Sequence, residues 1–381
     1  MSAPVRTPPA PRVRFHFRAG DLRWLAATAG ATALAGALTV GGASGVVRFV
    51  AAAAALSLLA RTVGQATEAM GEHLSSGATG VLQGAFGNLP ELFICLFSLK
   101  AGLQDVVRAA IVGSILANAV LVLGLALIAG GLRHGVQRFR SEPPRMAATL
   151  MLLAVTALAV PTLADLLHTP AQAHEAALSG VCAAVLLGVF AASLPFTLRG
   201  SPAVVPDAGA RDPELGDGAV EAPAPAEGGW SLAQSLAVLG VAALGAAAVS
   251  EWFVGALEPA AEALGLSRTF TGLVVVAVAG NAVENVVGIK LAAANKPDYA
   301  LSVILNSALQ VALAVAPVLV LASFVVGPRP LTLVLPPLLL AALFLAALVS
   351  AFVVYDGESI WLEGVALVGL YVMFAAAVWW G

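Results

Sequence analysis

The sequence has 381 residues, of which 60% are apolar and only 11% are charged, and its formal net charge is −3. Soluble domains usually carry about 25% charged residues, so this composition excludes an ordinary soluble enzyme. A nearly neutral chain gives no reason to expect a nucleic-acid partner. Most charges lie between apolar runs of roughly 20 residues, the length that crosses a bilayer. We therefore predict an all-α polytopic membrane protein whose outer surface contacts the lipid bilayer.

The chain begins with a segment rich in Pro and Arg that has no apolar signal core, so we expect residues 1–21 to form a disordered basic tail. Eleven apolar runs follow, and each is long enough for one transmembrane helix. The first is a leading helix within 22–45, five belong to residues 46–199, and five belong to residues 230–381. The runs lie at about 22–42, 46–75, 79–100, 104–131, 146–167, 174–198, 231–264, 269–294, 299–326, 330–354 and 360–380.

One long polar segment, residues 200–229, separates the two sets of five runs. It is rich in Pro, Gly, Ala, Asp and Glu. Such a composition cannot bury a core, so we predict an acidic linker that acts as a solvated tether. An acidic linker could instead attract cations as a regulatory site.

The loop arginines predict the orientation of the chain. Arginines gather in the N-terminal tail, in the loop after the fourth run and in the linker after the sixth. Cytoplasmic loops carry an excess of Lys and Arg, so we place the N-terminus and the linker in the cytoplasm and the C-terminus outside the cell membrane.

The third run contains the motif Gly87-Asn88-Leu89-Pro90-Glu91, and the eighth contains Gly280-Asn281-Ala282-Val283-Glu284. A carboxylate at the bilayer centre costs roughly 2.5–3.5 kcal/mol on insertion scales, so its default interpretation is functional. The motifs are 193 positions apart (280 − 87), and the same offset matches Ser114 with Ser307. Five helices is an odd number, so the two copies enter the membrane from opposite sides. This predicts two inverted five-helix repeats with a site at their interface, near the midplane.

The residue types of the two motifs favour a divalent cation. In the first motif Pro90 is expected to free the carbonyl of Phe86, and Gly87 allows the chain to bend. Carboxylate, amide and carbonyl oxygens suit Ca²⁺, whereas Mg²⁺ demands tighter geometry and gives up water reluctantly. The predicted ligands are Glu91, Asn88, Phe86 and Gly87 from the first copy and Glu284, Asn281 and Gly280 from the second. Two neighbouring carboxylates cannot both stay ionised without a cation, so the empty site is expected to take up protons.

Further polar residues form a second group of candidates. Ser114, Ser307 and Gln310 are expected near the site, although the serines could serve only in helix–helix hydrogen bonds. Four more carboxylates could attract cations at the mouths of a central cavity, or could simply lie at helix ends near the interface. They are Glu68, Glu72, Glu258 and Glu262.

The paired Gly-Asn-x-x-Glu motifs resemble those of the Ca²⁺/H⁺ exchangers of the Ca²⁺/cation antiporter superfamily. The stretches Gly113-Ser114-Ile115-Leu116 with Asn118 and 258–267 are similar as well. The resemblance implies eleven spans, an acidic cytoplasmic segment, and cation binding by Glu91 and Glu284 with Asn88 and Asn281. This sequence departs from the family pattern at Leu89-Pro90, which is more typical of Na⁺/Ca²⁺ exchangers, at Asn285, where a histidine is usual, and at Asn306, where a glycine is usual.

Taken together, these features predict a secondary active antiporter that exchanges Ca²⁺ for H⁺ by alternating access, with spans 2 and 7 sliding against the remaining helices. Two midplane glutamates would be shared by the cation and the protons. A Na⁺/Ca²⁺ exchanger or another monovalent cation/proton exchanger is the alternative within this class, and a cation channel is the alternative outside it. No nucleophile–base set or zinc motif is present, so we expect neither an enzyme nor a bound cofactor. The sequence carries no prediction of an oligomeric state.

Overall fold

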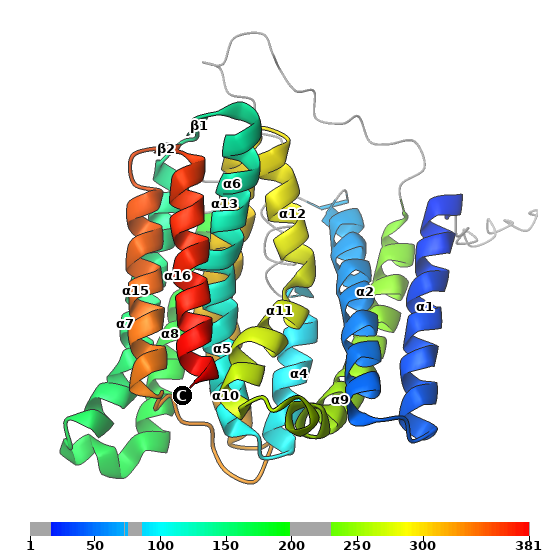
Figure 1. The fold of residues 1–381 in the computed structure, drawn as a ribbon, viewed down its shortest axis with the longest axis horizontal. Helices are drawn as coiled ribbons and strands as arrows, with labels where there is room; N and C mark the ends of the chain where they lie inside the picture. Colours follow the sequence, from blue (N-terminus) through cyan, green and yellow to red (C-terminus); the bar gives the residue numbers. More distant parts are fainter. Residues whose placement is uncertain (1–16, 72, 75–85, 199–229, 381) are drawn as a thin grey trace, which may run out of the picture.

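The computed structural model describes residues 17–71, 73–74, 86–198 and 230–380, apart from the side chains of 195–198 and 282–284. The regular secondary structure of the described chain is helical except for one short antiparallel pair, in which β1 (Gln137–Arg138) lies beside β2 (Glu358–Ser359). Figure 1 shows the helices standing side by side, with this strand pair at the top of the bundle.

The first part of the chain contains a leading helix and the elements of one repeat. They are α1 (Ala19–Val40), α2 (Gly45–Gly71), α4 (Leu89–Lys100), α5 (Gln104–Leu116), the π-helical segment η1 (Ala117–Val122), α6 (Leu123–His134), α7 (Glu142–Leu166), the 3₁₀ segment η2 (Pro170–His174) and α8 (Glu175–Leu198). Most of the predicted basic tail and the whole acidic linker lie outside the described residues.

The second part contains the elements of the other repeat. They are α9 (Leu232–Leu264), α10 (Arg268–Phe270), the π-helical segment η3 (Thr271–Val276), α11 (Ala277–Gly280), α12 (Ala282–Ala293), α13 (Pro297–Gln310), the π-helical segment η4 (Val311–Val315), α14 (Ala316–Ser323), α15 (Pro337–Val353) and α16 (Trp361–Trp379).

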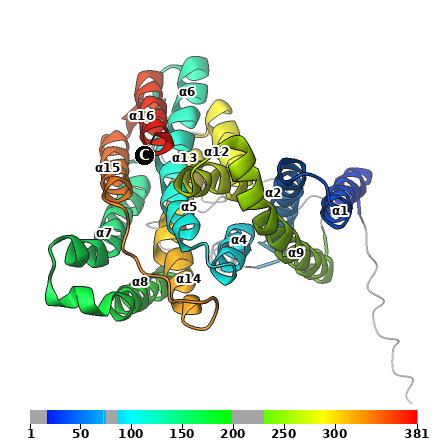
Figure 2. The same cartoon turned by 60° about the horizontal axis from the view of Figure 1, so that its bottom comes forward.

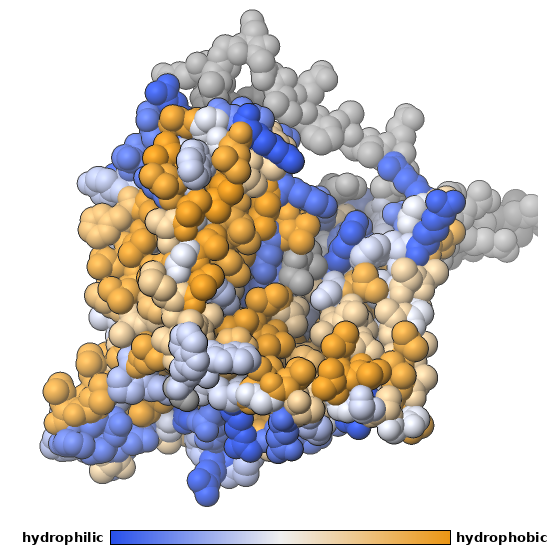
Figure 3. Space-filling model, viewed as in Figure 1, coloured by the Kyte–Doolittle hydropathy of each residue, from blue (hydrophilic) through white to orange (hydrophobic). Residues whose placement is uncertain are grey.

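Each of the eleven apolar runs of the sequence contains helix, but residues 330–336 of the tenth run are not helical, and the third and eighth runs are interrupted at residues 87–88 and at residue 281. Within the described residues, seven helices are long and apolar enough to cross a membrane, and the bent pair formed by 268–280 and 285–293 makes an eighth. α15 is apolar but shorter. Figure 3 shows apolar residues covering the middle of the bundle, with hydrophilic residues at the top and bottom. Exposed large side chains on the candidate spans include Leu153, Val181, Leu244 and Met373, as expected for a lipid-facing surface.

The first helices of the two repeats, α2 and α9, pack against each other in antiparallel directions. At one end, Gly45 lies so close to α9 that a Cβ atom there would be 2.7 Å from Cβ of Pro259. At the other end, the imidazole of His73 is 2.8 Å from the carbonyl oxygen of Trp230. Residues that are equivalent in the two repeats therefore run in opposite directions, as an inverted repeat requires.

The repeats also cross closely through α5 and η3. A Cβ atom on Gly113 would lie 2.1 Å from the carbonyl oxygen of Leu273, and one on Gly272 would lie 2.5 Å from that of Val106. Glycine at both positions lets the two backbones approach directly. This crossing brings the helices that carry the two motifs together.

The two ends of the bundle differ in their loops. The loop between α6 and α7, which contains Arg138 and Arg140, lies at the same end as the N-terminus of α1, whereas α16 ends at the opposite side (Figures 1 and 2). The side on which each end lies in the cell stays a prediction from the arginines.

Candidate functional site

The first motif lies where α4 begins. Asn88 is the residue that precedes the helix, and Pro90 and Glu91 lie in its first turn. The helical course is interrupted at Gly87 and Asn88, where the sequence predicts that the chain bends. Proline is tolerated at this position because the first N–H groups of a helix have no intrahelical partner.

The second motif lies at a matching break. α11 ends at Gly280, Asn281 follows it, and α12 begins at Ala282. Asn281 has φ −106° and ψ 16°, close to the φ −92° and ψ 13° of Asn88. The two asparagines therefore occupy equivalent positions at the N-termini of two helices, where backbone N–H groups favour negative charge.

Glu91 lies at the centre of the bundle and is 0% exposed. The hydroxyl of Ser114 on α5 donates a hydrogen bond to its Oε1 atom. Gly280 of the second motif packs against the same side chain, since a Cβ atom on Gly280 would be 3.3 Å from Cβ of Glu91. The aliphatic stem of Glu91 thus lies directly against the backbone of the second motif.

A chain of hydrogen bonds connects the motifs through Ser114. The Nδ2 atom of Asn281 donates to Oγ of Ser114 at 3.0 Å and to the carbonyl oxygen of Ala277, also at 3.0 Å. Ser114, which we expected near the site, therefore links Asn281 to Glu91. Asn281 and Ser114 are both 0% exposed.

Asn118 in η1 is a site residue that the predicted set omitted. Its Nδ2 atom donates to Oγ of Ser307 at 3.0 Å and to Oδ1 of Asn281 at 3.4 Å, so it bonds residues of the second repeat from within the first. Its Oδ1 atom is buried without a hydrogen-bond partner among the described residues. The spacing of four residues after Ser114 was the available signal, because such neighbours lie one turn apart on the same side of a helix.

Gln310 of the second repeat contacts the asparagine of the first motif, as Asn118 of the first repeat contacts the asparagine of the second motif. The Nδ2 atom of Asn88 donates to Oε1 of Gln310, at the end of α13, at 3.2 Å. Each motif asparagine is thus bonded to an amide side chain from the opposite repeat. The predicted site residues Ser114, Asn281 and Ser307 belong to the hydrogen-bonded chain that includes Glu91, and Asn88 and Gln310 form a separate pair. Phe86 and Gly87 directly precede Asn88.

The remaining predicted carboxylates lie elsewhere or outside the description. Glu284 belongs to α12, but its side chain is not among those described, and Glu72 lies outside the described residues. Glu68 is exposed near the end of α2. Glu258 near the end of α9 forms an ion pair with Arg268 at 2.5 Å, and Glu262 is exposed one turn later. A role for these acids at cavity mouths stays a prediction.

The site is rich in oxygen but poor in described charge. Among the side chains that the structure describes, no three His, Cys, Asp or Glu residues gather in a group that could hold a metal ion. The oxygen atoms that could coordinate a cation come from one carboxylate, two hydroxyls and several amide side chains among the described residues. Such a set suits a hard cation that tolerates neutral oxygen ligands, as Ca²⁺ does.

Comparisons with known proteins identify the family of this chain. The chain matches the family described as "Sodium/calcium exchanger protein" twice, over residues 44–199 and 234–380. It is similar to a Ca²⁺/H⁺ antiporter of Synechocystis sp., with 38% identity over 337 residues that cover 86% of this chain and 90% of the relative.

Solved structures show the same arrangement of helices. The fold is similar to that of native YfkE, with a TM-score of 0.78, 29% identity, and coverage of 94% of this chain and 100% of the other. It is also similar to the sodium-calcium exchanger NCX_Mj, with a TM-score of 0.55, 18% identity, and coverage of 88% and 98%. At 18% identity, this second likeness shows the fold alone.

Proposed function

Because this chain belongs to the sodium/calcium exchanger protein family, and is therefore a multi-pass membrane transporter and not an enzyme, we propose that it exchanges Ca²⁺ for H⁺ by alternating access. The similar antiporter of Synechocystis is named for this exchange. The observation that carries the proposal is the position of Glu91, which is 0% exposed and packed against the second motif. No lipid-facing or purely structural role requires a carboxylate there.

In this proposal Glu91 and Glu284 bind either one Ca²⁺ or protons. Two ionised carboxylates at one site balance the charge of one divalent cation. When the cation leaves, their mutual repulsion favours protonation, so occupancy by Ca²⁺ and occupancy by H⁺ exclude each other. The hydroxyl of Ser114 can donate to the ionised form of Glu91 and turn toward other acceptors when that carboxylate is protonated.

The amide network supplies the neutral ligands. Asn88 and Asn281 flank the site. Gln310 bonds Asn88 and Asn118 bonds Asn281, each from the opposite repeat, and Ser307 accepts a second hydrogen bond from Asn118. Ca²⁺ takes 6–8 oxygen ligands, so two carboxylates need several such neighbours.

Alternating access would require one part of the bundle to move past the rest. We assign the moving part to the antiparallel pair α2 and α9, with α1 attached to it. The hydroxyl of Thr62 on α2 lies within hydrogen-bonding distance of Trp24 and Thr28 on α1, at 3.1 and 3.3 Å, so α1 would travel with α2.

The test is a coupled flux measurement in inverted membrane vesicles. An imposed H⁺ gradient should drive Ca²⁺ uptake, and an imposed Ca²⁺ gradient should drive H⁺ in the opposite direction, both without Na⁺. Uptake that ignores the H⁺ gradient and requires a Na⁺ gradient would replace this proposal with Na⁺/Ca²⁺ exchange. Ca²⁺ flux that never moves H⁺ uphill would indicate a channel.

The site assignment is tested separately. Glu91→Gln and Glu284→Gln should each abolish exchange, because either change removes a charge and a proton acceptor. Glu175→Gln at the start of α8 is the matched control and should transport normally. Exchange that survives in either motif variant would contradict the assignment.

A further inference from the structure

The second repeat contains a ladder of polar side chains that the first repeat lacks. Along α13, a polar residue recurs every fourth position from the end of the bundle to the site: Asp298, Ser302, Asn306 and Gln310. All four are partly exposed, although α13 lies among other helices. Residues four apart are neighbours on a helix and rise about 6 Å per step, so the four form one stripe.

Each end of this polar ladder has a defined contact. At the outer end, the carboxylate of Asp298 accepts a hydrogen bond from the backbone N–H of Arg140 at 2.8 Å. At the inner end, Gln310 accepts from Asn88 of the first motif. Between them, Nδ2 of Asn306 donates to Oγ of Ser302 at 3.2 Å. The stripe therefore connects the surface loop before α7 with the cation site.

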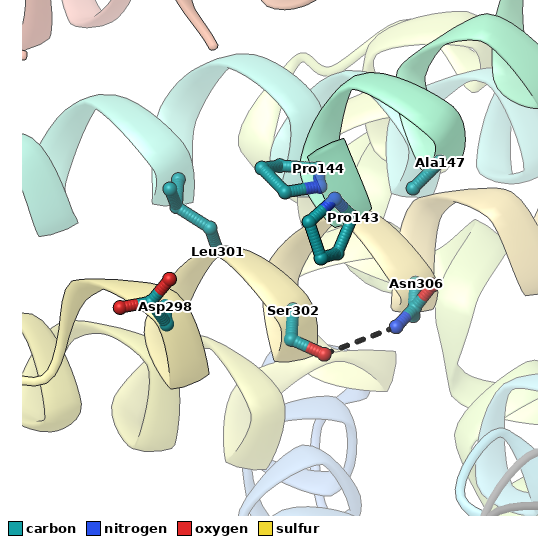
Figure 4. A pocket seen from close by; sticks show the side chains of 7 residues that line it. All are labelled: Pro143, Pro144, Ala147, Asp298, Leu301, Ser302 and Asn306. Carbon is teal, nitrogen blue, oxygen red and sulfur yellow. Dashed lines mark hydrogen bonds between the residues drawn. The ribbon is translucent and has the colours of Figure 1, made fainter. Parts of the chain in front are cut away.

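A groove follows the outer part of the ladder. Asp298, Ser302 and Asn306 line one wall, and Pro143, Pro144 and Ala147 of α7 form the other (Figure 4). Its free space is sufficient for about one water molecule at a time. The α7 wall offers no side-chain hydrogen bonds, so the polar groups that water could meet there come from α13.

The equivalent helix of the first repeat has no such path. The offset of 193 positions places Asp105, Ala109, Gly113 and Ala117 opposite the ladder residues. After Asp105 these positions are buried and have no polar side chain, and Gly113 is packed directly against the backbone of Leu273. The ladder therefore does not follow from the repeat and serves only one end of the bundle.

We propose that the polar ladder of α13 lines a narrow water path through which protons pass between the site and the bundle end that contains the loop before α7. A water molecule needs two to four polar partners, and the carboxylate, hydroxyl and amide groups of the ladder supply them one turn apart. Ca²⁺ does not fit this path, because it would need 6–8 oxygen ligands at each step and the ladder offers about one side chain per turn. If that end is cytoplasmic, as the arginines predict, the path releases protons that entered from outside.

This inference rests on the proposed Ca²⁺/H⁺ exchange, and the comparison of two transport modes tests it. Ca²⁺/Ca²⁺ exchange needs the site and its movement but no net proton transfer. Asn306→Leu should therefore slow Ca²⁺/H⁺ exchange at least tenfold while Ca²⁺/Ca²⁺ exchange stays near the wild-type rate. Asn306→Gln should restore most of the proton-coupled rate, and Val303→Leu on the same helix is the control.

Equal losses in both modes would overturn the separate proton path, as would no loss in either. If the wild-type protein itself moves no H⁺ against Ca²⁺, the proposed function fails instead.

A second measurement does not depend on transport. With Cys95 and Cys182 replaced by alanine, Ser302→Cys and Asn306→Cys should react with Ag⁺ in water, and Leu305→Cys, at a buried position, should not. Unreactive cysteines at both ladder positions would show that the groove is dry.

Discussion

At the crossing of α5 and η3 the backbones of the two repeats approach each other directly, and Gly113→Ala tests the importance of this contact. The added Cβ atom would lie 2.1 Å from the carbonyl oxygen of Leu273 and 2.7 Å from its carbonyl carbon. Close carbon–oxygen contacts in proteins lie at about 3.3–3.6 Å, so the helices would have to separate by about 1.2 Å. Both clashing atoms belong to the backbone, and no side-chain rotation can relieve them.

Overpacking of this kind typically costs about 1–3 kcal/mol, and a backbone clash belongs at the upper end of that range. The cost extends to function because Ser114 is the next residue. A shift of about 1.2 Å would lengthen its 3.0 Å bond to Asn281 beyond hydrogen-bonding distance. We expect Gly113→Ala to lower the thermal unfolding temperature of the purified protein and to abolish Ca²⁺/H⁺ exchange in vesicles.

Gly240→Ala in α9 is the matched control. A Cβ atom on Gly240 would have nothing within 4 Å, and alanine is a better helix former than glycine by up to about 1 kcal/mol. This variant should be as stable as the wild type or more so, with normal transport. A Gly113→Ala protein that melts and transports like Gly240→Ala would refute the direct approach of the two backbones.

Three further predictions concern single side chains. Ser114→Ala removes the hydroxyl that donates to Glu91, and a hydrogen bond to a charged group contributes about 1.5–3 kcal/mol. The KM for Ca²⁺ should therefore rise about tenfold or more. An unchanged KM would contradict the contact. Asn118→Leu removes the hydrogen bonds to Asn281 and Ser307 and should abolish exchange while the protein still folds. Transport in vesicles checks the loss of exchange, and the size-exclusion profile checks the fold. Gly364→Leu on α16 would place its Cβ atom 2.5 Å from the carbonyl oxygen of Gly124 on α6. The two helices should separate, and α16 should become sensitive to proteolysis. Resistance equal to that of the wild type would argue against this close contact.

The parts of the fold that the sequence predicts are those with local signals. Apolar runs of membrane-spanning length became helices because a lipid-exposed backbone must satisfy its own hydrogen bonds. The motif glycines and asparagines marked the two helix breaks, and the repeat offset placed Ser114 and Ser307 near them. Each of these inferences needs only residues close in sequence or a regular spacing.

Other features depend on distances that no local pattern encodes. Asn118 and Ser307 are 189 positions apart, and Asn88 and Gln310 are 222 apart, so their hydrogen bonds follow only from how the repeats dock. The π-helical segments η1 and η4 also had no sequence signal. They occupy nearly the same place in the two repeats, since 311 − 193 is 118, within η1. Single-turn π segments are frequent at functional sites, where they redirect side chains.

The site is not symmetric, because the amide side chains of the two repeats occupy different positions: Gln310 aligns with Ala117, and Asn118 aligns with Val311. Position 117 is one residue before Asn118, and one residue turns a side chain by about 100° around a helix. The longer glutamine side chain lies just before η4 and still reaches Asn88, whereas the shorter asparagine lies inside η1 and reaches both Asn281 and Ser307.

The two motif asparagines consequently differ before any cation binds. The bond between Asn88 and Gln310 uses the amide N–H of Asn88, so it does not occupy the oxygen that a cation would need. The oxygen of Asn281 instead accepts from Asn118 at 3.4 Å, a length at which hydrogen bonds are weak. A divalent cation can take that oxygen while Asn118 keeps its shorter bond to Ser307. Cation binding would therefore change the contact between the repeats at Asn281, on one side of the site only.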